Sequence, residues 1–241
     1  MVWIIRKKYV ALAIVVCCII GFMLSLTPQS TPVVSVAKPE PIAKHRVVVV
    51  DAGHGGEDGG AVSVSGVAES GINLAIACRL KEIFAFLGQE VLMTRSDDKA
   101  IYDDDAQTLR QKKVSDLKNR VALVNSYPDA VLISIHQNSL PQHPKVHGAQ
   151  VFFNTVQGAE TLGQIVQDQL NQSANETSPK VSKAIDSSIY LMKEVTCPAA
   201  LVECGFMSNA AELSSLQNST YQTTLATAIA AGFTQYRVNE G

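Results

Sequence analysis

The sequence predicts one α/β domain with a mainly parallel sheet and helices on both faces, preceded by an N-terminal segment that forms a transmembrane or signal helix. Short uninterrupted apolar runs rich in β-branched residues are typical of strands buried on both faces. Stretches with helical periodicity alternate with these runs, which is the pattern of an α/β sheet. The chain has 241 residues and is 46% hydrophobic, which is enough for one packed domain and excludes a disordered chain.

The charge balance excludes a nucleic-acid-binding protein. The chain carries 20 basic and 22 acidic residues, and three of the basic ones cluster at residues 6–8. Domains that bind nucleic acids carry a strongly basic surface, and no such excess is present here. We therefore expect no nucleic-acid partner.

An uncharged apolar run at residues 9–26 follows the basic cluster at residues 6–8. As a helix this run would be about 27 Å long, close to the ~30 Å hydrocarbon core of a bilayer. The basic residues before it predict that the rest of the chain lies outside the cytoplasm. We expect residues 1–26 to be a retained membrane anchor, with a cleaved signal peptide as the alternative. In either case the working part of the protein is exported.

The remainder divides into a linker and a catalytic domain. Residues 27–44 are rich in Pro, Ser, Val and Lys without helical periodicity and predict a linker. Residues 45–241 contain the alternating signals and form the predicted domain.

Four elements are predicted in the first half of the domain. Four consecutive valines at 47–50 predict a buried strand. Residues 69–87 predict a helix, because apolar residues recur at helical spacing and Gly88 ends the pattern. A second strand is predicted at 90–94 and a second helix at 109–126.

The second half of the domain continues the alternation. Residues 130–135 form a buried apolar run and predict the third strand. A strand at 150–153 and a helix at about 158–170 follow. Residues 199–202 predict the last buried strand, and residues 210–236 supply one or two closing helices.

Metal-binding residue types follow three of the predicted strands. His54 lies in the glycine-rich segment after the first strand, His136 directly follows the third, and Glu203 directly follows the last. In open α/β sheets, ligands bind beyond the carboxyl ends of the strands. Glu69 opens the first predicted helix and can reach the same edge. The four side chains are therefore predicted to converge.

Two histidines and one glutamate, with a fourth position left to water, form a recognised catalytic zinc set. We predict His54, Glu69 and His136 as ligands of Zn²⁺ and Glu203 as the general base of a metal-assisted hydrolysis. Each residue has a plainer interpretation. His54 would be a turn residue, Glu69 a helix N-terminal acid, His136 a hydrogen-bonded core histidine, and Glu203 half of a buried ion pair.

Three further polar residues are candidates for supporting roles. Asp51 either orients a metal ligand or caps a turn. Asn138 either binds substrate or holds its loop. Arg120 either forms a structural salt bridge or contacts substrate.

Six short motifs, in this order and spacing, give the chain a resemblance to the zinc-dependent N-acetylmuramoyl-L-alanine amidases of the amidase-3 type, over about residues 47–236. The motifs are Asp51-Ala52-Gly53-His54-Gly55-Gly56, Glu69 followed by Asn73-Leu74, Met93-Thr94-Arg95, Leu117-Lys118-Asn119-Arg120, Ser134-Ile135-His136-Gln137-Asn138 and Glu203-Cys204-Gly205-Phe206-Met207-Ser208-Asn209.

The resemblance implies zinc bound by His54, Glu69 and His136, with Glu203 as the catalytic carboxylate. It also implies a peptidoglycan substrate, cleaved at the amide between the lactyl group of N-acetylmuramic acid and L-alanine. Alternatives are another zinc peptidase or deacetylase of the cell wall, or a wall-binding module without catalysis.

One branch of the family is particularly similar, the germination-specific amidases of endospore formers. The resemblance rests on Ile189-Tyr190-Leu191-Met192, followed by Val195-Thr196 and Pro198. It implies action on the spore cortex during sporulation, as a step toward the muramic δ-lactam that germination needs. The expected location is the outer face of the membrane, the cell wall or the forespore intermembrane space. Because the predicted domain is short and has no wall-binding repeats, we also expect an accessory or localising protein.

Overall fold

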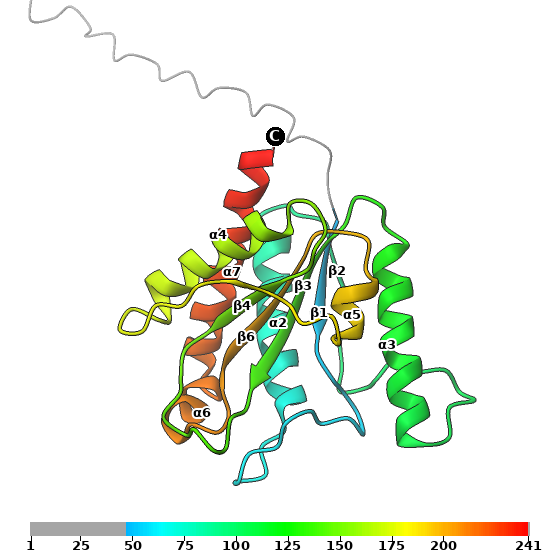
Figure 1. Ribbon diagram of the computed structural model, residues 1–241. Coiled ribbons are helices and arrows are strands. Elements are labelled where there is room, and N and C mark those ends of the chain that lie inside the picture. Colours follow the sequence, from blue (N-terminus) through cyan, green and yellow to red (C-terminus); the bar gives the residue numbers. More distant parts are fainter. Residues whose placement is uncertain (1–46, 241) are drawn as a thin grey trace, which may run out of the picture. The chain divides into compact units, whose positions relative to one another are not determined.

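The computed structural model describes residues 47–240, which fall within one compact unit (Figure 1). The predicted N-terminal helix at residues 1–26 and the linker at residues 27–44 lie outside the described residues. None of the helices in the described part of the chain is both long and apolar enough to cross a bilayer.

A six-stranded sheet forms the centre of the domain, in the order β2-β1-β3-β6-β4-β5. β1 pairs in parallel with β2 and β3, and β3 pairs in parallel with β6. β4 runs antiparallel to β6, and β5 pairs in parallel with β4, so the last two strands point the opposite way. The strands are β1 (Val48–Ala52), β2 (Val91–Met93), β3 (Val131–Asn138), β4 (Gln150–Phe153), β5 (Lys183–Ala184) and β6 (Ala199–Phe206).

Helices cover both faces of this sheet (Figure 1). α2, α4 and α7 pack on one face and share the larger apolar core, whereas α3 and α5 pack on the other face around a smaller one. The helices are α2 (Glu69–Phe86), α3 (Leu109–Asn125), α4 (Ala159–Ser173), α5 (Tyr190–Glu194), α6 (Ala210–Leu216) and α7 (Ser219–Glu240).

The valine run at the start of the domain shows why the central strands are apolar throughout. Val48 and Val50 point into the larger core, whereas Val47 and Val49 point into the smaller one. Successive side chains of a strand alternate between its faces, so only a continuous apolar run can bury both.

Local signals define the ends of the two long helices that flank the site. α3 begins at a capping box, in which the Thr108 hydroxyl accepts from the backbone N–H of Gln111 and the Gln111 side chain accepts from the Thr108 N–H. α2 ends just before Gly88, whose φ of +72° is the left-handed conformation that glycine adopts at low cost.

The predicted α/β class with a mainly parallel sheet is confirmed, and the closing segment forms two helices. Two features differ from the sequence prediction. β3 and β6 continue beyond their apolar runs to Asn138 and Phe206, with a register shift between His136 and Asn138. β5 and α5 were not predicted, because elements of two and five residues are too short to show a periodicity.

Candidate metal centre and active site

The three predicted metal ligands converge at one edge of the sheet. His54 follows β1, Glu69 is the first residue of α2, and His136 lies in β3. One potential ligand atom from each lies within 4.8 Å of the other two. His136 Nδ1 is 3.0 Å from one Glu69 oxygen, and His54 Nε2 is 3.4 Å from the other. These three side chains can hold a metal ion.

The Glu69 carboxylate is fixed by its neighbours as well as by the two histidines. Its Oε1 accepts from the backbone N–H of Gln137 at 3.1 Å and from the side-chain amide of Asn73 at 3.0 Å. Its Oε2 accepts from the Ala61 N–H at 2.9 Å. Although burial opposes ionisation, the nearby histidines hold the pKa of Glu69 far below its usual range. The group is therefore an anion, which is the form in which a carboxyl group binds a metal ion.

Glycine is required around the predicted ligands because their side chains approach the backbone closely. A Cβ at Gly53 would lie 2.3 Å from the His136 ring, and a Cβ at Gly60 would lie 2.5 Å from Glu69 Oε2. His54 itself has a φ of +60° and is the one non-glycine residue with positive φ within residues 47–240. Such a conformation costs about 1–3 kcal/mol and is typical of functional sites.

Asp58 is hydrogen-bonded to the His54 ring. His54 Nδ1 donates to Asp58 Oδ2 at 3.0 Å, because a carboxylate can only accept. His54 Nε2 therefore faces Glu69. In the absence of metal, burial acts to lower the pKa of His54, but Asp58 and Glu69 together raise it to about 9. A metal ion that binds His54 Nε2 must displace the proton that this nitrogen carries in the charged ring.

Glu203 lies next to His136, in register with it on the neighbouring strand β6. Its Oε2 is buried and accepts no hydrogen bond from any residue that the structure describes. Burial, with a smaller contribution from Glu69, raises the pKa of Glu203 to about 7, against the opposing effect of the two histidines. Glu203 is thus available to exchange a proton near neutral pH.

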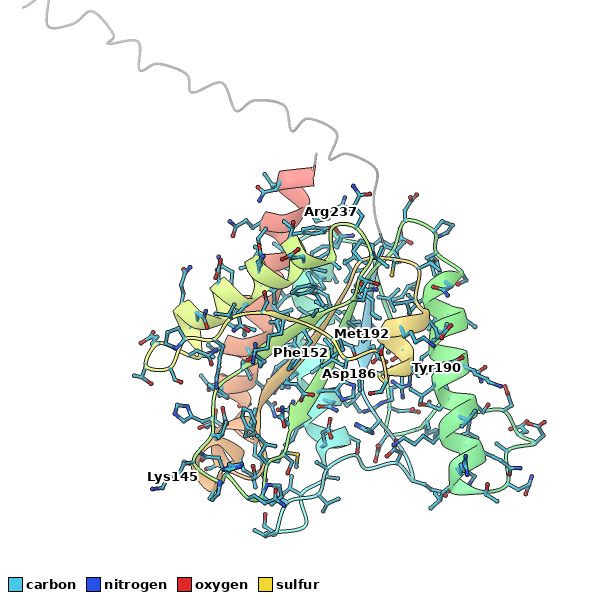
Figure 2. The ribbon with its side chains drawn as sticks, in the orientation of Figure 1. Lys145, Phe152, Asp186, Tyr190, Met192 and Arg237 are labelled. Atoms are coloured by element: carbon cyan, nitrogen blue, oxygen red, sulfur yellow. The ribbon has the colours of Figure 1, made fainter. Side chains whose placement is uncertain are left out.

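A cavity of about 320 Å³ opens over these residues. Its floor is the strand edge, and its walls come from α3 and α5, which lie on the same side of the sheet. Figure 2 shows Tyr190 at α5 on this side. The lining residues are Asp51, Gly53, His54, Asp58, Lys113, Asp116, Leu117, Arg120, Ser134, His136, Ser188, Ile189, Tyr190, Leu191, Leu201 and Glu203.

Asp51 and Arg120 form a buried ion pair that also lines the cavity. Arg120 Nη1 is 2.6 Å from Asp51 Oδ1, and Arg120 also pairs with Asp116. Burial acts to raise the pKa of Asp51, but Arg120 and hydrogen bonds from two hydroxyl groups lower it to about 2. Arg120 Nη2 donates to the backbone oxygen of His54 at 2.8 Å, so the pair also supports a predicted metal ligand.

Asn138 lies at the end of β3 and is not among the residues that line the cavity. Its side-chain oxygen accepts from the Ser139 N–H at 2.8 Å. Its backbone oxygen accepts from the Met207 N–H, also at 2.8 Å. Both contacts hold the loop after β3.

Sequence reasoning did not identify Asp58, and it named Asn73 only as part of a motif, without a role. Asp58 lies four residues after His54, and Asn73 lies four residues after Glu69, one turn along α2. The helical spacing of Glu69 and Asn73 is a signal that would have found the second contact. Nothing in the spacing of His54 and Asp58 indicates their contact, because it depends on the conformation of a glycine-rich loop.

Comparison with known proteins places this chain in a family. The family model described as N-acetylmuramoyl-L-alanine amidase matches residues 48–235. The germination-specific N-acetylmuramoyl-L-alanine amidase of Bacillus subtilis is 34% identical over 81% of this chain and 81% of its own length. In the solved structure of the CwlD amidase of Clostridioides difficile in complex with the GerS lipoprotein, the amidase is 35% identical, with a TM-score of 0.77 over 81% of this chain and all of that one. The catalytic domain of CwlV from Bacillus (Paenibacillus) polymyxa is 30% identical, with a TM-score of 0.68 over 79% of this chain and 97% of that one. The chain therefore belongs to the amidase-3 family of N-acetylmuramoyl-L-alanine amidases.

Proposed function

We propose that this protein is a zinc-dependent peptidoglycan amidase that cleaves the amide between the lactyl group of N-acetylmuramic acid and L-alanine. The observation that carries the proposal is the position of Glu203. Its buried Oε2 has no hydrogen-bond partner within residues 47–240, and it lines the cavity that also contains His54 and His136. A carboxyl group with a pKa near neutrality, placed beside a metal-binding set, suits acid–base catalysis of hydrolysis.

The donor set fits zinc. Two imidazoles and one carboxylate are a known catalytic combination for this ion, and His54, Glu69 and His136 supply them. Asp58 behind His54, and Asn73 behind Glu69, are outer contacts of the kind that orient zinc ligands. When bound, zinc would polarise the scissile carbonyl and lower the pKa of a water molecule.

Glu203 would carry the proton through the reaction. Its Oε2 accepts a proton from the attacking water and returns it to the amine of L-alanine as that amine leaves. The raised pKa of about 7 makes both the charged and the neutral form accessible near neutral pH. Asp51 and Arg120 would act beneath the site by holding the His54 backbone, and Asn138 would hold its loop.

The experiment that tests the function compares the purified chain with its Glu203→Gln variant on peptidoglycan, with zinc supplied. Mass spectrometry would detect peptides with a free N-terminal L-alanine. We expect these peptides with the native protein and not with the variant. Native protein that releases a different product would contradict the proposed bond specificity, and a chain that binds no zinc would contradict the mechanism.

Two alternatives predict different products. A wall peptidase would release D-amino acid, and a deacetylase would release acetate, in place of a free L-alanine amine. A wall-binding module without catalysis would keep its biological activity after Glu203→Gln.

The biological setting is proposed from the relatives. A germination-specific amidase and the CwlD enzyme support action on the spore cortex during sporulation, toward the muramic δ-lactam. The CwlD complex with a lipoprotein supports an accessory partner outside the cytoplasm. Spores from a deletion strain should lack muramic δ-lactam, which muropeptide analysis would measure. Unchanged lactam content would contradict this role.

A further inference from the structure

Two adjacent acids of the loop that carries His54 pair with two adjacent lysines of α3. Lys112 Nζ pairs with Glu57, and Lys113 Nζ lies 3.2 Å from Asp58 Oδ2. The two pairs differ in one respect. Within residues 47–240, Glu57 makes no hydrogen bond or ion pair with a predicted metal ligand, whereas Asp58 receives the hydrogen bond from His54 Nδ1.

Asp58 is itself held in place by its surroundings. Its backbone N–H and C=O both pair with Gly55, and its Oδ1 accepts from the Gly60 N–H at 3.3 Å. An aspartate side chain is an anion at neutral pH and can only accept hydrogen bonds.

A carboxylate at this position selects one arrangement of the His54 ring. Because Asp58 can only accept, the proton of a neutral His54 ring resides on Nδ1 and the lone pair on Nε2. That nitrogen faces Glu69 Oε2 at 3.4 Å, which is the place where a shared metal ion would be held. Without the acceptor, a ring whose side chain is 19% exposed could rotate or change tautomer.

We propose that Asp58 is a positioning residue that sets the affinity of the metal site by fixing the His54 ring, and that Lys113 of α3 holds Asp58 for this task. The inference rests on the proposed zinc function and extends it to the link between α3 and the ligand loop. The neighbouring Lys112–Glu57 pair joins the same two segments without contacting a ligand, so it provides a matched control.

The expected effects differ among the variants of the full-length chain. In Asp58→Asn, the side-chain oxygen keeps its contact with Gly60, so the amide nitrogen, a donor, faces His54 Nδ1 and favours the wrong tautomer. We expect zinc affinity to fall about 10- to 100-fold, as is usual when an outer contact of a metal-bound histidine is removed. Lys113→Met should lower it about two- to fivefold, because Lys113 is half-exposed. Lys113→Arg should restore the native affinity, and Glu57→Gln and Lys112→Met should leave it unchanged.

Zinc affinity would be measured by competition with a chromophoric chelator, and the coordination geometry by the visible absorption spectrum of the Co²⁺-substituted protein. The cobalt spectrum should change in Asp58→Asn and remain native in Glu57→Gln, an effect that a general loss of stability would not produce. Native zinc affinity and a native cobalt spectrum in Asp58→Asn would overturn the proposal, as would equal losses of affinity in Asp58→Asn and Glu57→Gln.

Two further outcomes separate the inference from the proposed function. If Asp58→Asn fails to fold, the Lys113→Met and Lys113→Arg pair decides, because neither substitution touches the contact with Gly60. Equal affinity in those two variants would then overturn the inference. If the unaltered chain binds neither zinc nor cobalt, the proposed zinc function fails, and the inference fails with it.

Discussion

Replacing Glu203 by glutamine should stabilise the metal-free protein while it abolishes catalysis. The unfolded chain ionises this carboxyl group near its usual pKa of 4.5, whereas burial raises the pKa in the folded protein to about 7. Between these two values the folded state binds the extra proton, so the free energy of unfolding falls as the pH rises. Above pH 7 the loss is complete.

The magnitude follows from the size of the shift. A rise in pKa from 4.5 to about 7 corresponds to a penalty of about 3 kcal/mol at pH 8. Glutamine has a similar shape and no charge, so Glu203→Gln should gain about that amount at pH 8 and almost nothing at pH 4. For a domain of this size, the gain corresponds to an increase of roughly 6–12 °C in Tm.

The assay is thermal or urea unfolding of both proteins at pH 4, 6 and 8, with a chelator present throughout. The chelator matters because a bound cation beside Glu203 would favour its ionised form and hide the effect. A variant that is no more stable than the native protein at pH 8 would refute the reasoning. The same conclusion would follow from a gain of equal size at pH 4.

Four further predictions concern the surroundings of the site. Gly60→Ala should weaken zinc binding at least about tenfold, measured by competition with a chelator. The added Cβ would lie 2.5 Å from Glu69 Oε2, and residue 60 has a φ of +69°. Native affinity in this variant would contradict the prediction. Arg120→Met should lower the free energy of unfolding by about 3–5 kcal/mol in urea titrations, because it leaves Asp51 charged and buried; a neutral effect would show that the pair is dispensable. Below pH 4, the contribution of Asp51 to native stability should fall by about 2 kcal/mol as the pH approaches 2, since the pKa of Asp51 is lowered from 3.8 to about 2. An Asp51→Asn variant should lose that part of the acid dependence. Cys197 should resist thiol reagents at pH 8 until the protein unfolds, because burial raises its pKa to about 11; its rapid modification in the folded protein would be inconsistent with this burial.

The fold was largely predictable because its central strands and long helices carry strong periodic patterns. Patterns of this kind do not show where a strand stops when its last residues are polar. His136 and Glu203 look like the first residues of loops, yet they lie within β3 and β6. Backbone pairing with the neighbouring strand extends both elements and holds the two side chains in register.

The convergence of His54, Glu69 and His136 was predictable because the ends of two parallel strands and the start of the helix after the first strand meet at one edge of the sheet. The contacts around these three side chains could not be predicted from the sequence. Lys113 and Asp58 belong to a helix and a loop that are distant in sequence, and neither residue type is unusual on a protein surface. Their meeting depends on how α3 docks, which no local pattern encodes.

The helices on the two faces of the sheet differ in how much apolar surface they bury. The buried residues of α2 are mostly apolar, whereas those of α3 are Asp116, Arg120 and Val124, two of which are charged. Backbone amides of α3 should therefore exchange their hydrogens with solvent faster than those of α2, through local opening that leaves the larger core intact. α3 also forms a wall of the cavity. Peptidoglycan, a bulky cross-linked polymer, would therefore approach the protein on the face whose helix opens locally more often.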